Sequence, residues 1–97
     1  MDEFQEVKNY LDISWNDPET DARIAGIIQR AKAALKNKIG NVDFEKDEAA
    51  KQLLLDCCRY INAGILDEFY KNYESEILFF FHFNRIGAME HGSEEAD

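Results

Sequence analysis

A stripe of apolar residues between Pro18 and Ile39 constrains the fold of this chain more than any other feature. Its members lie within an arc of about 120° when each residue advances by about 100°, as on one face of an amphipathic helix. They are Ile24, Ile27, Ile28, Ala31, Leu35 and Ile39. Asp17 is placed to cap this helix, Pro18 fits its first position, and Gly40 suits the residue after its end. The sequence therefore predicts a long helix over residues 18–39.

Two further segments have apolar residues at helical spacing. Residues 2–12 predict a short helix, because Val7 and Leu11 recur on one side of it. A second long helix is expected from a cap at residue 47 to about residue 70 or 72. Gly64 would lie inside that helix, where a close crossing against another helix would explain a residue that weakens helices.

The run from Ile77 to Phe81 is continuously apolar, and Phe83 extends it. Periodicity does not separate helix from strand in so short a run, and both remain open. We favour a short helix, because a lone strand in a helical domain has no partner. Left exposed, such a run promotes aggregation, so we expect it to be buried in the core or in an assembly.

Residues 87–97 are small and acidic without periodicity, which predicts a disordered tail. Residues 1–86 then form a single domain. The expected fold class is all-α, a small bundle of three long or medium helices with a short C-terminal helix and a flexible acidic tail.

Charge and composition limit the classes of function. The net charge of −9 argues against nucleic acid binding as the main role, since phosphates are repelled. No signal region and no membrane-spanning run is present in the sequence. Cys57 and Cys58 are adjacent and point apart on a helix, which predicts small core residues in a reducing compartment. We expect the chain to fold in a cytoplasm.

The residue types needed for catalysis or metal binding are not grouped in the sequence. The acidic spacing from Asp17 to Asp21 imitates the start of a calcium loop, but Ala22 stands where that loop needs glycine. His82 and His91 have no second ligand at a suitable spacing, and we expect His82 to be a buried or half-buried structural residue. The sequence predicts no enzyme activity, no cofactor and no metal site.

Several residues are instead candidates for contacts with a partner or another subunit. Leu55, Leu66 and Tyr70 would share the back of the second long helix with Arg59, as a subunit contact or a locally covered surface. The candidate interface residues are Trp15, Arg23, Arg30, Leu55, Arg59, Leu66, Tyr70, Phe79, Phe80 and Phe83.

Two of these predictions have plain structural alternatives. Arg23 and Arg30 either belong to a solvated face or pair with acidic surfaces of neighbouring copies in a head-to-tail ring. Trp15 is either a lid over the core or an anchor at a protein interface.

The order and spacing of these features resemble those of one known family. The matching positions are Val7, Lys8, Tyr10, Leu11, Ile13, Asp17, Glu19, Asp21, Ile24, Ile27, Ile28 and Ala31, followed by the block at residues 53–77 with its basic and aromatic pair Arg59 and Tyr60. Over about residues 4–78 the chain resembles the head-tail connector (adaptor or head completion) proteins of long-tailed phages and prophages.

This resemblance implies a structural protein of the virion. Its copies would form a ring that joins the portal vertex of the capsid to the tail or stopper protein, after assembly in the cytoplasm of the bacterial host. DNA would only pass through the lumen, without sequence-specific contacts, and no membrane would be involved. The resemblance does not cover the apolar run or the acidic tail, so a portal contact there is a hypothesis. The alternative is a small helical dimer, a protein-interaction or regulatory module that binds through Leu55, Leu66 and Tyr70.

Overall fold

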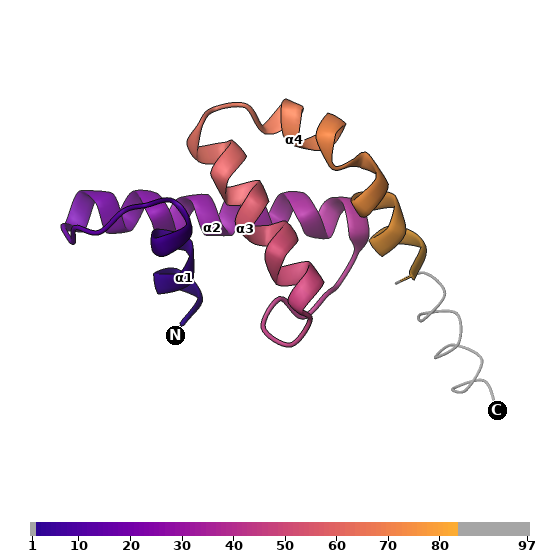
Figure 1. Ribbon diagram of the computed structural model, residues 1–97, viewed down its shortest axis with the longest axis horizontal. Helices are drawn as coiled ribbons and strands as arrows, with labels where there is room; N and C mark the ends of the chain where they lie inside the picture. Colours follow the sequence, from indigo (N-terminus) through magenta and orange to yellow (C-terminus); the bar gives the residue numbers. More distant parts are fainter. Residues whose placement is uncertain (1, 84–97) are drawn as a thin grey trace.

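The computed structural model describes residues 2–83, and these form helices and turns with no strand (Figure 1). The helices are α1 (Glu3–Tyr10), α2 (Pro18–Ile39), α3 (Glu48–Asn62) and α4 (Leu66–Asn72), and residues 74–83 are helical after a turn at Tyr73. The all-α prediction is confirmed for these residues, as is the helix favoured for the apolar run. The predicted tail at residues 87–97, and residues 84–86 of the predicted domain, lie outside the described residues.

Aspartates begin the first three helices, as the sequence predicts for two of them. The side chains of Asp2, Asp17 and Asp47 accept hydrogen bonds from backbone N–H groups three residues further on, at 2.8, 2.9 and 3.1 Å. These bonds satisfy donors that the first turn of a helix leaves unpaired. At the other end of α2, Gly40 has a φ of 85°, so this predicted helix end is confirmed. Helix α1 is shorter than predicted.

The core lies where α3 crosses α2 near its middle, with α1 packed against both (Figure 1). Every member of the apolar stripe predicted for residues 18–39 is buried. The principal residues of α3 that meet this stripe are Ala50, Leu53, Leu54, Cys57, Cys58 and Ile61. Their burial supplies the main stabilisation of the bundle, at about 25 cal/mol for each Å² of apolar surface removed from water.

The prediction of one continuous helix over residues 47–72 is wrong. Helix α3 ends at Asn62, and Gly64 adopts a φ of 77°, which costs glycine little but disfavours other residues. The N–H of Gly64 donates to the carbonyl of Ile61 at 2.9 Å, and the N–H of Ile65 donates to that of Tyr60 at 2.9 Å. This is the hydrogen-bond pattern of a Schellman motif, in which glycine ends a helix.

The close helix crossing predicted at Gly64 is also absent. A Cβ atom placed on Gly64 would have no neighbour within 4 Å, so its backbone conformation explains the glycine. After the turn, α4 folds back and fully buries Phe69, whose ring lies 5.6 Å from that of Tyr60. The turn therefore redirects the chain so that α4 covers one end of α3.

Candidate interaction surface

The helical segment 74–83 presents aromatic side chains on the side away from the core. Ile77 and Phe80 are buried, whereas Phe79 and Phe83 are 63% and 64% exposed. On a helix, Phe79 and Phe83 lie about 160° and 120° around the axis from Ile77 and about 100° and 60° from Phe80, so they lie outside the buried stripe. Their rings stack on each other with centroids 6.1 Å apart. Glu76 lies on the same side and is exposed, and we call Glu76, Phe79 and Phe83 the outward face.

The segment is apolar on a second side as well. Leu78 and Phe81 are partly exposed beside a shallow groove of about 300 Å³. The remaining lining residues are Lys38, Tyr70, Glu74 and Ile77. His82 is exposed, so the prediction of a buried or half-buried histidine is wrong. Phe80 belongs to the core, so only two of the three predicted phenylalanines face outward.

A separate groove lies at the turn between α3 and α4. It has a volume of about 350 Å³, and we call it the turn groove. Its lining residues are Arg59, Tyr60, Ala63, Ile65, Glu68 and Asn72. Ile65 is 42% exposed at its wall. The guanidinium carbon of Arg59 lies 5.6 Å from the centre of the Tyr60 ring and 5.8 Å from that of Tyr10, within the range of cation–π attraction.

The apolar strip predicted on the back of one long helix is not formed. Because the chain turns at Gly64, Leu66 and Tyr70 belong to α4, while Leu55 belongs to α3. All three are half-buried and pack against the core of their own chain. This packing fits the alternative of a locally covered surface, and a contact of these three residues with another protein stays a prediction.

The two predicted arginines lie exposed on α2. Arg23 donates a hydrogen bond to the side-chain oxygen of Asn62 at the end of α3. Arg30 is exposed on the same helix. Within the part of the chain that the structure describes, neither forms an ion pair, and pairing with a neighbouring copy stays a prediction.

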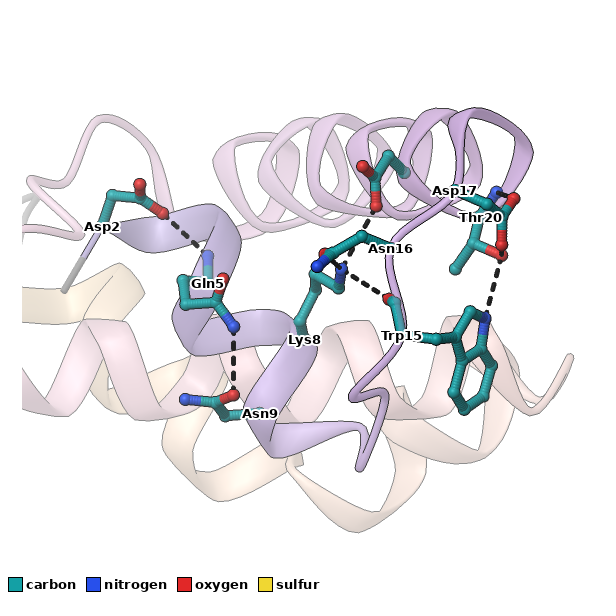
Figure 2. Close-up of polar contacts among 9 residues, drawn as sticks. Asp2, Gln5, Lys8, Asn9, Trp15, Asn16, Asp17 and Thr20 are labelled. Atoms are coloured by element: carbon teal, nitrogen blue, oxygen red, sulfur yellow. Dashed lines mark hydrogen bonds and ion pairs between the residues drawn. The ribbon is translucent and has the colours of Figure 1, made fainter.

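Trp15 does not cover the core. Its indole is 54% exposed, and the indole N–H donates to the Thr20 hydroxyl at 3.2 Å (Figure 2). Its carbonyl accepts a hydrogen bond of 2.8 Å from the Lys8 ammonium, which also donates to the side chains of Asn16 and Asp21. Lys8 is only 1% exposed. The tryptophan is therefore held at the start of α2 with its ring facing outward.

A polar cluster that sequence reasoning missed joins three parts of the chain. Asp56 is buried on α3 and accepts hydrogen bonds from the hydroxyl of Tyr10 and from the side chain of Gln52. The bond to Asp56 is the main cause of the raised pKa of Tyr10, and burial, followed by the charge of Asp56, raises the pKa of Tyr73 to about 12. The sequence indicated this cluster only through Asp56, a carboxylate between Leu55 and Cys57 on the core side of a helix. The arrangement ties α1 to α3.

The described residues offer no further chemical centre. Among residues 2–83, no group of three or more His, Cys, Asp or Glu is arranged to hold a metal ion. No helix in this part of the chain is long and apolar enough to cross a membrane. Comparisons with family models, curated proteins and solved structures found no match. The exposed aromatic and basic surfaces are therefore the features on which a functional argument rests.

Proposed function

We propose that this chain is a structural subunit of the head-tail connector type, which assembles with copies of itself into a ring. The outward face is the observation that supports this proposal most directly. A helix at the surface of a monomer normally presents polar residues outside its buried stripe. Here Phe79 and Phe83 lie outside that stripe with most of their surface exposed. Contact with another protein molecule would remove this surface from water.

In this proposal the ring joins the portal vertex of a phage or prophage capsid to the tail or to a stopper protein. Its partners are other copies of the chain, the portal protein and the stopper or tail-completion protein. DNA passes through the lumen, and the net charge of −9 would weaken its adhesion to the wall. The subunit acts by assembly in the host cytoplasm and at the head-tail junction, without catalysis or a cofactor.

A ring of identical subunits needs two different complementary surfaces on each copy. The exposed arginines of α2 suit one of them, because they carry charge opposite to that of an acidic cluster elsewhere in the chain. That cluster consists of Asp43, Glu45, Asp47 and Glu48. Reversing the charge of Arg23 and Arg30 should therefore disrupt the ring while leaving the fold intact.

Native mass spectrometry over a wide range of protein concentrations tests the proposal. A closed oligomer of many copies supports a connector, whereas a tight dimer at every concentration contradicts it and indicates the small interaction module. The double variant Phe79→Glu with Phe83→Glu should dissociate the oligomer. Ser14→Glu with Asn37→Glu adds the same charge at exposed positions elsewhere and serves as the control.

A chain that stays monomeric alone is tested on its proposed partner. The wild type and both double variants are then co-purified with the portal protein encoded in the same genome. Retention of the wild type and the control, with loss of the phenylalanine variant, supports the proposal. A genome without portal and capsid genes near this gene contradicts it.

A further inference from the structure

We propose that the outward face of one copy enters the turn groove of the next copy, with Glu76 placed beside Arg59. This contact rests on the proposed function and names a further pair of surfaces, besides the arginines of α2 and the acidic cluster, that would join neighbouring subunits. Both surfaces belong to this chain. The outward face has two exposed phenylalanine rings and a carboxylate, and the turn groove has an apolar wall and a guanidinium group.

The inserting surface is a ridge of two stacked rings. Phe79 and Phe83 are one helical turn apart and keep their rings nearly parallel, at an interplanar angle of 18°. They project from a segment that Ile77 and Phe80 fix to the core. Rigid aromatic side chains lose little conformational freedom on binding, which suits them to anchor an interface.

The receiving surface is an open groove with an apolar wall. Its volume of about 350 Å³ is near the lower end for small-molecule sites, so it fits a few side chains better than a cofactor. Ile65 and Ala63 are exposed there, and the ring of Tyr60 supplies an aromatic side. Insertion of Phe79 and Phe83 would bury apolar surface on both copies.

Charge selects the groove and the direction of insertion. Two copies with a net charge of −9 each repel one another, so a stable contact should place a cation opposite an acid. Arg59 is exposed, is held over the rings of Tyr10 and Tyr60, and forms no ion pair within residues 2–83. Within its own chain, the charge of Asp56 acts on Arg59, and Glu68 also lines the turn groove. Glu76, the acidic residue of the incoming outward face, should therefore lie at Arg59 and away from Glu68.

Charge also disfavours a symmetric pairing of two outward faces. Such a pairing would place Glu76 of both copies in one contact, with no cation on either outward face. The two surfaces share no residue, because the turn groove is lined by residues between 59 and 72, whereas the outward face lies in segment 74–83, which follows α4 (Figure 1). A contact between two different surfaces repeats from copy to copy and closes as a ring when the rotation allows it.

A charge exchange tests this contact. Glu76→Arg and Arg59→Glu should each raise the concentration at which half of the chain is assembled by at least about tenfold, the effect of 1.4 kcal/mol. The double variant should restore assembly, because every contact then pairs the two charges in reverse. Glu74→Arg makes the same change on the other side of segment 74–83 and should have little effect. Urea unfolding of each variant separates lost contact from lost fold.

Cysteine cross-linking decides which surfaces meet, including in a chain that associates only weakly. Ala63→Cys and Ser75→Cys variants of different tagged mass are mixed at high concentration and oxidised. Ser75 is exposed one helical turn before Phe79, so both phenylalanine rings stay in place. Predominantly mixed dimers support the contact, since the native Cys57 and Cys58 are buried. Dimers of Ser75→Cys with itself, or no cross-link at all, overturn it. Normal assembly of both single charge variants overturns this contact alone, whereas a stable dimer of the wild type contradicts the proposed function as well.

Discussion

The Lys8 ammonium and the Asp21 carboxylate form an ion pair in which only the lysine is buried. Their Nζ and Oδ1 atoms are 3.2 Å apart, with side-chain exposures of 1% for Lys8 and 41% for Asp21. The ammonium also donates to the carbonyl of Trp15 and to the side chain of Asn16. A buried charge is tolerated when it is paired and fully hydrogen-bonded, and these three acceptors meet that condition. Lys8 therefore fastens α1 to the start of α2 (Figure 2).

Replacing Lys8 with methionine keeps most of the side-chain volume but removes all three hydrogen bonds. We expect Lys8→Met to lower the free energy of unfolding by about 2 kcal/mol, since bonds to charged groups are worth about 1.5–3 kcal/mol. Urea unfolding followed by Trp15 fluorescence measures this loss. The matched change Lys46→Met, at an exposed turn residue, should stay within about 0.5 kcal/mol of the wild type. Equal stability of the two variants would contradict the role given to Lys8.

The tyrosines around Asp56 predict a loss of stability at alkaline pH. The pKa of Tyr73 rises from its ordinary value of 10.0 to about 12, because burial and then the Asp56 carboxylate favour the protonated hydroxyl. The unfolded chain therefore releases this proton first as pH rises. The raised pKa of Tyr73 thus contributes to the free energy of unfolding. This contribution is complete below pH 10 and is lost as pH rises through about 12.

Urea unfolding of the wild type and Tyr73→Phe across this range measures that contribution. The stability of Tyr73→Phe should fall less steeply with pH than that of the wild type. The thiols of Cys57 and Cys58 titrate in the same direction in both proteins, so the comparison cancels their effect. Parallel curves for the two proteins would show that Tyr73 is not linked to folding in this way.

Cys57 and Cys58 should be almost inert toward thiol reagents in the folded protein. Burial raises the pKa of each thiol from 9.0 to about 12. The thiolate is the reactive form, so its population at neutral pH falls by about a thousandfold. Alkylation followed by mass spectrometry should show labelling only in urea concentrations that unfold the chain. Rapid labelling of either thiol in native buffer would mean that α3 opens locally.

The sequence predicted α2 fully because every local signal agreed there. Asp17 and Pro18 mark its start, the apolar stripe fixes its buried side, and Gly40 marks its end. Agreement of capping, periodicity and termination leaves few alternatives. The outward position of Phe79 and Phe83 follows from the same periodicity, once the segment is known to be helical.

The break between α3 and α4 was missed because the apolar pattern continues across it. Ile61, Ile65 and Phe69 recur every four residues, as they would on one unbroken helix. Only Gly64 marks the break, and a single glycine is compatible with a helix interior. The contact between Tyr10 and Asp56 joins residues 46 positions apart, so it depends on how α1 packs against α3 and has no local signature.

A pair of glycine substitutions tests the turn between α3 and α4 directly. Gly64 has a φ of 77°, so Gly64→Ala should lower the free energy of unfolding by about 1–2 kcal/mol, the cost of a left-handed conformation for a residue with a Cβ atom. Gly26 lies inside α2 with nothing within 4 Å of its Cβ position, and Gly26→Ala should raise that free energy by about 0.5–1 kcal/mol. Urea unfolding gives both values, provided the slope with denaturant is unchanged. If alanine stabilises both positions alike, residues 48–72 form one continuous helix and the turn groove does not exist.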